Sequence, residues 1–192
     1  MDIGTATEQH QDAGRTTASG NGLSVRLATR ADEPEILQLL QTMHAENGIH
    51  PLDETLARET FNLAFDQKGG ILGVVGPTND IRAMLGLLIT RFWFTSDWHL
   101  EEIFNFVRPD QRQGTHYAED LINFARLCST TCDLPLVIGV LTNRRVEAKV
   151  RLYQRILGVP SGAFWVYNAP AWHDQANDDF WRLAFKRRRR GE

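Results

Sequence analysis

The clearest pattern of hydrophobic and polar positions lies near the middle of the chain, between residues 103 and 124. An apolar run that ends at Val107 has the character of a strand, and a polar loop, 108–115, follows it. Beyond the loop, hydrophobic residues recur at the i, i+3, i+4, i+7 spacing of one helix face: Ala118, Leu121, Ile122 and Ala125. The segment is therefore predicted to be a strand, a loop and a helix. Free N–H groups at the start of such a helix favour a phosphate, although most strand-loop-helix units bind none.

The same reasoning predicts elements on either side of this segment. Asp32 is placed to cap the first helix and Gly48 to end it. The run 134–141, rich in Val, Ile and Leu, is typical of a strand covered on both faces. Residues 172–185 fit a short helix or an extended segment equally well. The predicted strands are 23–28, 71–75, 81–94, 98–107, 134–141 and 163–167, and the remaining predicted helices are 51–65 and 143–157.

Length and composition indicate one domain. The chain has 192 residues and 42% hydrophobic content, enough for an ordinary core, and we expect the domain to span residues 23–185. Residues 1–22 almost lack large apolar side chains and are expected to be a disordered tail. Residues 186–192 form a basic tail with 5 of the 21 Lys and Arg residues. We favour a solvated tail over weak polyanion contacts, and the acidic remainder of the chain is a poor general nucleic-acid binder.

Cysteine usage and hydropathy exclude several classes of protein. Cys128 and Cys132 lie on the predicted central helix, without a second Cys or His pair at zinc spacing. We therefore expect neither a disulfide framework nor a metal site. No apolar run approaches the ~20 residues that span a bilayer, and no signal-peptide pattern opens the chain. The expectation is a cytoplasmic protein without membrane contact.

The order of the predicted elements resembles that of the GNAT superfamily of N-acetyltransferases over residues 23–168. In that family a loop of the form Q/R-x-x-G-x-G/A follows a strand and opens a helix. The run from Gln113 to Ala118 is similar to it at both ends, with His116 at the usual first glycine. A second register starts at Arg112 and places Thr115 and Tyr117 at the small positions. The segment 143–158, with its Asn, its L-Y pair and its final glycine, is also similar, and 151–164 looks like versions in bacterial and phage-encoded members.

The resemblance implies an α/β (α+β) fold, with a mixed, mostly antiparallel central sheet of about six to seven strands flanked by helices on both faces. It also implies acetyl-CoA as co-substrate. Backbone N–H groups near Phe106 and Val107 would polarise the thioester carbonyl, and Asn143 would bind the pantetheine arm or simply cap a helix. The implied cofactor-binding residues are Phe106, Val107, Arg112, Gln113, Gly114, Thr115, His116, Tyr117, Ala118 and Asn143.

Acetyl transfer to an amine needs a base for the amine and often an acid for the leaving thiolate. In the family an acidic residue on the strand before the loop commonly acts as the base, and Glu101 and Glu102 lie there; a salt bridge is the alternative for each. Because successive side chains on a strand alternate in direction, only one of the two should reach the cleft. Tyr153, in the L-Y pair, matches the tyrosine that would protonate the thiolate, although the position also suits a core residue.

The sequence thus predicts an acyl-CoA-dependent N-acyltransferase, which most simply transfers acetyl from acetyl-CoA to an amine on a small molecule or a protein. One alternative is a GNAT-like binding or regulatory protein without catalysis, which the missing glycines would allow. Another is a nucleic-acid-associated protein that uses the Arg-rich tail. A homodimer is compatible with the sequence. Trp93, Trp98 and Trp165 are expected in the core or in the wall of the cleft.

Overall fold

The structure is a computed structural model that describes residues 24–48, 51–140, 142 and 145–162. The predicted terminal tails, the predicted strand 163–167 and Trp165 lie outside these residues. Five strands and four α-helices follow in the order β1 (Val25–Leu27), α1 (Glu33–Asn47), α2 (Glu54–Phe65), β2 (Gly70–Val75), β3 (Ala83–Thr90), β4 (His99–Val107), α3 (Tyr117–Cys132), β5 (Leu136–Val137) and α4 (Val146–Leu157). Two short 3-10 turns, Arg30–Asp32 and Pro109–Gln111, precede α1 and α3.

The strands form one sheet in the order β1-β2-β3-β4-β5. The first four are antiparallel neighbours, and β5 joins β4 in parallel. The prediction of a mixed, mostly antiparallel sheet is confirmed. The predicted count of six to seven strands is not supported, because the part of the chain that the structure describes contains five strands and the sixth predicted strand lies beyond it.

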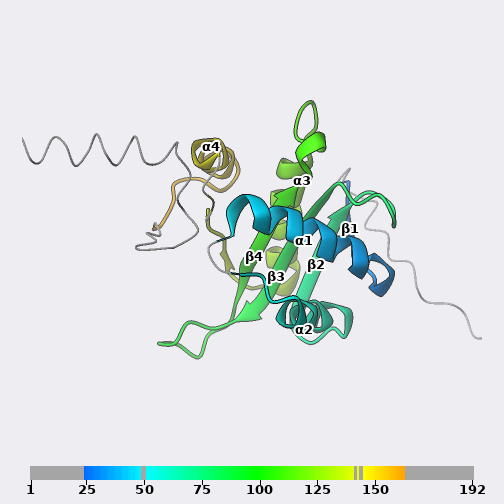
Figure 1. Ribbon diagram of the computed structural model, residues 1–192. Helices are drawn as coiled ribbons and strands as arrows, with labels where there is room; N and C mark the ends of the chain where they lie inside the picture. Colours follow the sequence, from blue (N-terminus) through cyan, green and yellow to red (C-terminus); the bar gives the residue numbers. More distant parts are fainter. Residues whose placement is uncertain (1–23, 49–50, 141, 143–144, 163–192) are drawn as a thin grey trace, which may run out of the picture.

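Helices cover both faces of the sheet, as predicted (Figure 1). On one face, α1 and α2 pack against β2, β3 and β4 through a core that includes Ile36, Phe61 and Phe106. On the other face, α3 packs through Leu121 and Phe124. The fourth helix, α4, contacts α3. The sheet is therefore the middle layer, and the ends of its strands can hold a site between helices from both sides.

Local chemistry explains where the helices begin and end. The carboxylate of Asp53 accepts the N–H of Leu56 at 3.0 Å and caps α2. Asp133 ends α3 in the left-handed conformation, with φ 53°. Asp32 is the N-cap residue of α1, as predicted, but its side chain accepts no hydrogen bond from an N–H group of that helix. Its buried carboxylate accepts hydrogen bonds from Arg26, from Thr29 and from Thr78 instead, and so ties β1 to the β2–β3 turn.

Strand β4 contains a bulge that changes the direction of its side chains. Leu87 pairs with Glu102 and Gly86 pairs with Phe104, so one extra residue, Ile103, is inserted in β4. As a result Glu102 and Asn105 both reach α4, whereas Phe104 joins the core under α1 and α2. Without the bulge, Glu102 and Phe104 would share a face.

Strands β4 and β5 pair with each other over a short stretch only. Their pairing is limited to Leu100 with Leu136 and Glu101 with Val137. Among the described residues, the rest of β4, from Glu102 to Val107, is paired with β3 on one side only. The predicted strand 134–141 is therefore too long, and its prediction as a strand covered on both faces is wrong, because both residues of β5 are only partly buried.

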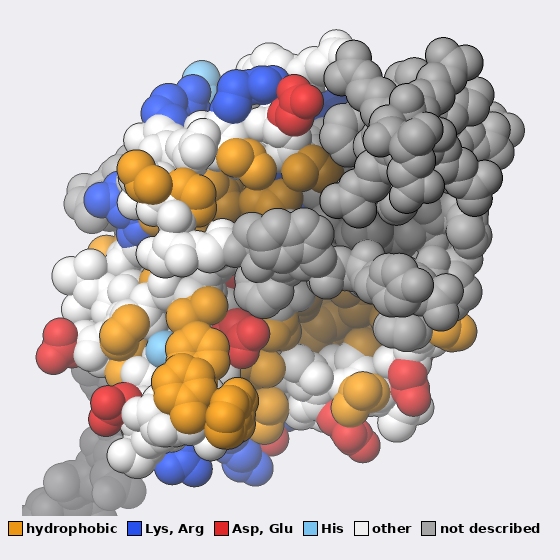
Figure 2. All heavy atoms as spheres, turned by 90° about the vertical axis from the view of Figure 1, so that its left-hand side faces the viewer, with side chains coloured by type: hydrophobic (Ala, Val, Ile, Leu, Met, Phe, Trp, Pro, Cys, Tyr) orange, Lys and Arg blue, Asp and Glu red, His pale blue; other side chains and the backbone are white. Residues whose placement is uncertain are grey.

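The predicted strand 81–94 is also too long, since β3 ends at Thr90 and the chain turns away from the sheet. Trp93 is 96% exposed and Trp98 is 50% exposed, so neither belongs to the core. Figure 2 shows large hydrophobic side chains gathered on the surface of the molecule, on the side that lies at the left in Figure 1. Phe92 stacks on the buried His99 with ring centroids 4.3 Å apart, which anchors the hairpin to β4.

Candidate functional site: the gap between β4 and β5

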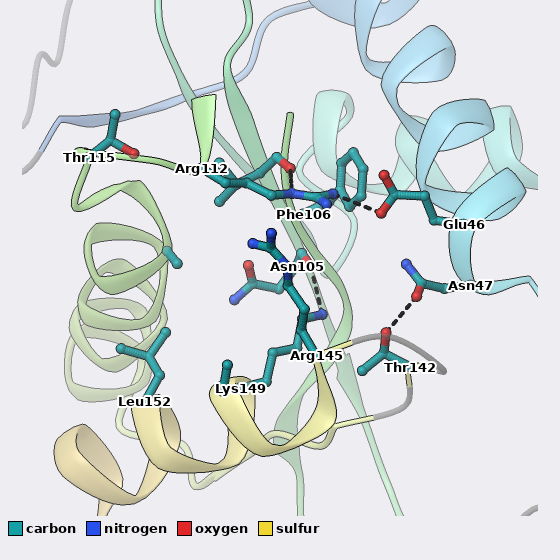
Figure 3. Close-up of a pocket in the computed structure, with 13 residues that line it drawn as sticks. Glu46, Asn47, Asn105, Phe106, Arg112, Thr115, Thr142, Arg145, Lys149 and Leu152 are labelled. Carbon is teal, nitrogen blue, oxygen red and sulfur yellow. Dashed lines mark hydrogen bonds and ion pairs between the residues drawn. The ribbon is translucent and has the colours of Figure 1, made fainter. Parts of the chain in front are cut away.

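A pocket of about 190 Å³ opens where β4 and β5 diverge (Figure 3). The end of α1 forms one wall, the start of α3 and the loop before it form another, and the first turns of α4 form the third. The lining residues are Glu46, Asn47, Asn105, Phe106, Val107, Arg112, Thr115, Ala118, Thr142, Arg145, Ala148, Lys149 and Leu152.

The exposed edge of β4 supplies backbone groups to this pocket. The N–H of Arg108 donates to Arg82 O on the β3 side at 2.8 Å. The backbone N–H and C=O groups of successive residues alternate in direction along an antiparallel strand. The backbone groups of Phe106 therefore also point toward β3, and those of Asn105 and Val107 point into the gap. Of the two predicted backbone donors, the N–H of Val107 therefore faces the gap and that of Phe106 faces β3, although Phe106 is among the lining residues.

Two cationic side chains bind the carbonyl groups of this edge. Arg112 Nε donates to Val107 O at 2.9 Å, and Lys149 Nζ donates to Asn105 O at 3.5 Å (Figure 3). Arg112 also forms an ion pair with Glu46 at 2.8 Å, and its guanidinium lies 5.0 Å from the centre of the Phe106 ring. The long side chain of Arg112 is thus held at three points across the mouth of the gap.

The loop before α3 has features that favour an anion. Gly114 has φ +70°, and a Cβ there would meet no atom within 4 Å. The N–H of Asp120 donates to His116 O at 2.9 Å, so the N–H groups of the three residues before it, 117–119, precede the first helical hydrogen bond of α3. These N–H groups and the helix dipole favour negative charge at this point.

The charges that line the pocket are mostly positive. Arg112, Arg145 and Lys149 face a single carboxylate, that of Glu46. Arg145 forms no ion pair within the described residues. A pocket of this charge, next to a helix N-terminus, suits a ligand with several phosphate oxygens.

Glu102 and Tyr153 are not among the lining residues but lie next to two of them, Asn105 and Lys149. The Tyr153 hydroxyl donates to Glu102 Oε1 at 3.4 Å and accepts from Asn105 Nδ2 at 3.4 Å. Burial raises the pKa of Glu102 to about 7 from its ordinary 4.5, while the charge of Lys149 and the hydrogen bond from Tyr153 oppose the shift. Burial and the Glu102 charge raise the pKa of Tyr153, so its hydroxyl is protonated at neutral pH. The pair contains a carboxyl that gains and loses a proton near pH 7 and a hydroxyl that keeps its proton.

The structure brings together part of the predicted set. Of the two candidate carboxylates, Glu102 faces Tyr153, while Glu101 has a half-exposed side chain near His99. In the loop, Arg112, Thr115 and Ala118 line the pocket. Gln113, Gly114 and His116 are exposed beside it, and the Tyr117 hydroxyl accepts from Arg82 at 3.4 Å instead. Asn143 lies outside the described residues.

Several pocket residues were not predicted. Glu46 and Asn47 come from the end of α1, and Asn105 faces the gap because of the bulge. Arg145 and Lys149 carry a signal that the sequence analysis missed, since two cationic residues four apart lie on one side of a helix start.

Comparison of whole folds decides the architecture. The chain matches no protein-family model and no curated protein sequence. Solved structures match well. A ribosomal-protein-alanine N-acetyltransferase from Brucella melitensis biovar Abortus 2308 has a TM-score of 0.58 and 15% identity, over 76% of this chain and 98% of that chain. A predicted acetyltransferase from Clostridium acetobutylicum, solved with acetyl-CoA, has a TM-score of 0.60 and 14% identity, over 79% and 99%. The chain has a GNAT-like fold.

A third structure with this fold is AAC(6')-Iy in complex with a bisubstrate analogue, CoA-S-monomethyl-acetylneamine. It has a TM-score of 0.59 and 15% identity, over 76% of this chain and 97% of that chain. At such identities the likeness establishes the GNAT-like fold, and the chemistry has to be argued from the residues of the site.

Among the described residues, no helix has the length and apolar content to cross a bilayer, and no group of three or more His, Cys, Asp or Glu side chains is arranged for a metal ion.

The raised pKa of Glu102 predicts a pH dependence of stability. Between about pH 4.5 and 7 the folded protein keeps a proton on Glu102 that the unfolded chain has released, so this group's contribution to stability falls as the pH rises through that window and is constant above it. Glu102→Gln cannot ionise, and we expect its Tm relative to the parent to rise by several degrees between pH 5 and pH 8. Thermal melts of both proteins measure this.

Glu101→Gln is the matched control, because the Glu101 side chain is 51% exposed on the same strand. Its Tm difference from the parent should change much less over the same range. An equally small change for Glu102→Gln would contradict the raised pKa of Glu102.

Proposed function

We propose that the chain is an acyl-CoA-dependent N-acyltransferase that transfers acetyl from acetyl-CoA to an amine acceptor. The observation that carries the proposal is the gap between β4 and β5, where backbone groups of Asn105 and Val107 and the N-terminus of α3 border one pocket. Acetyl-CoA has a thioester, a pantetheine arm rich in amides and a phosphorylated nucleotide. The thioester needs a polarising hydrogen-bond donor, the pantetheine arm a polar strand edge and the nucleotide an anion site. The pocket has a candidate for each.

Each part of the pocket has a proposed role. The N–H groups of Asn105 and Val107 would donate to the thioester oxygen, where charge develops during acyl transfer. The N-terminus of α3, Gly114 and Arg145 would hold phosphate oxygens. The acetyl-CoA bound to the Clostridium structure and the CoA analogue bound to AAC(6')-Iy support this choice of co-substrate.

Proton transfer is assigned to Glu102 and Tyr153. With a pKa near 7, Glu102 is suited to accept a proton from an ammonium group at neutral pH. The Tyr153 hydroxyl, which lies between Glu102 and Asn105, is suited to donate a proton to the leaving thiolate and to recover one from Glu102. The acceptor class proposed is an amine on a small molecule or a protein, and Glu101 is given no role in the chemistry.

One observation favours the alternative of a non-catalytic GNAT-like binding protein. Arg112 and Lys149 already bind the carbonyl groups of Val107 and Asn105, where a pantetheine arm would make contact. If those contacts persist in the complex, acetyl-CoA binds without productive placement of its thioester. Binding without turnover in the presence of amines would support this alternative.

A charge at Gly114 tests the anion site. We expect Gly114→Asp to weaken acetyl-CoA binding by about tenfold or more, the effect of losing ~1.4 kcal/mol of attraction at the α3 N-terminus. Gly114→Asn is the matched control, because both side chains tolerate a positive φ and have the same size, but only Asp is charged. Titration calorimetry with acetyl-CoA measures both. Equal affinities for the Asp and Asn variants would place the phosphates elsewhere.

Removal of the Tyr153 hydroxyl tests the proposed acid. Tyr153→Phe keeps the ring, and we expect turnover of acetyl-CoA with an amine panel to fall by ~10²–10⁴-fold, as for loss of a positioned acid. Its two hydrogen bonds are long, so the stability cost should be at most ~1 kcal/mol. Turnover assays are paired with thermal melts. A lowered Tm with normal turnover would show that Tyr153 is only structural.

A further inference from the structure

Lys149 is an amine inside the pocket, and the transfer proposed above does not use it. Its side chain extends from the first turn of α4 to Asn105 O, and it lines the gap together with Val107 and Leu152 (Figure 3). The other two cations of the pocket, Arg112 and Arg145, are guanidinium groups, which stay protonated and are poor nucleophiles. Lys149 is therefore the one side chain among the described pocket residues that can attack an acyl donor as an amine.

We propose that Lys149 is a self-acetylation site: acetyl-CoA bound in the gap acetylates Lys149 Nζ of the same molecule when no acceptor is present. This rests on the proposed function. The ammonium nitrogen is held 3.5 Å from Asn105 O, on the strand edge whose N–H groups would bind the thioester oxygen. The amine and the carbonyl carbon would therefore meet within one pocket, and such proximity replaces a bimolecular encounter.

The surroundings of Lys149 favour the neutral amine that attack requires. Burial lowers the pKa of Lys149 from its ordinary 10.5, and the charge of Arg112 acts in the same direction, while Glu102 and Glu46 oppose it. Lys149 also lies one helical turn before Tyr153, so the groups assigned to proton transfer are on its own side of α4.

The reaction balances without a further reactant. The Lys149 ammonium gives one proton to the Glu102 carboxylate, and the neutral nitrogen attacks the thioester carbon. A C–N bond forms and the C–S bond breaks, and the second proton from nitrogen goes to the thiolate, which leaves as the CoA thiol. The product is an uncharged amide in the pocket, and we expect it to block a second acetyl-CoA from binding.

Mass spectrometry of the full chain tests the proposal, because the sequence has only three lysines: Lys68, Lys149 and Lys186. The protein is incubated with acetyl-CoA and no acceptor, and acetylation of each lysine is followed by peptide mapping. Lys68, whose side chain is 70% exposed, reports ordinary chemical acetylation. We expect Lys149 to react about tenfold faster or more, to approach one acetyl group per chain, and to be slowed by excess CoA. Its first-order rate should not change with protein concentration.

Calorimetry on the same protein separates this inference from the proposed function. Acetyl-CoA binding with Lys149 acetylated no faster than Lys68 overturns self-acetylation alone, and so does a rate that rises with protein concentration. Absence of acetyl-CoA binding overturns both. Lys149→Arg keeps the positive charge and should bind acetyl-CoA without acetylation at this position. Lys149→Gln mimics the acetylated lysine and should bind acetyl-CoA at least about tenfold more weakly than the parent does.

Discussion

The separation of β4 from β5 is the constraint on which the site depends. Backbone N–H and C=O groups strongly require partners, and within the part of the chain that the structure describes no second strand pairs with this side of β4 after Glu101. The chain meets part of this need with side chains, since Arg112 and Lys149 bind the carbonyl groups of Val107 and Asn105. The gap is therefore a polar strand edge kept open between three helices, α1, α3 and α4. A linear ligand with alternating amide groups can pair with such an edge as a strand would.

The bulge at Ile103 connects this edge to the buried chemistry. By adding one residue it aims both Glu102 and Asn105 at Tyr153, and it leaves Phe104 and Phe106 in the opposite core. Burial disfavours the ionised form of the Glu102 carboxyl, which is why its pKa is raised to about 7. The geometry of the sheet, rather than a particular motif, produces this raised pKa.

Much of the fold was predictable, because helical spacing and apolar runs directly reflect the two faces of the sheet. The strand that ends at Val107 and the loop that follows it were predicted correctly, and so was the helix with Leu121 and Ile122 inside. The predicted strand lengths were wrong where hydrophobic residues lie at the surface instead of in the core. An apolar run such as 134–141 does not reveal that its strand is only two residues long and partly buried, and Trp93 is hydrophobic in a hairpin tip that leaves it in solvent.

The site was less predictable for a physical reason. Alternation along β4 suggested that one of Glu101 and Glu102 faces the cleft, but it cannot show which, and it misses Asn105 because a bulge leaves no mark in the periodicity. Glu46 and Lys149 enter the pocket from helices distant in sequence. Such residues are joined to the site by tertiary packing, and only the three-dimensional arrangement identifies them.

Residue-resolved amide hydrogen exchange, with and without acetyl-CoA, tests most directly whether the gap is the acyl-CoA site. The account predicts slower exchange at Asn105 and Val107 and in residues 113–119, with β2 unchanged as an internal reference. Slower exchange confined to other parts of the chain, with Asn105 and Val107 unaffected, would contradict it.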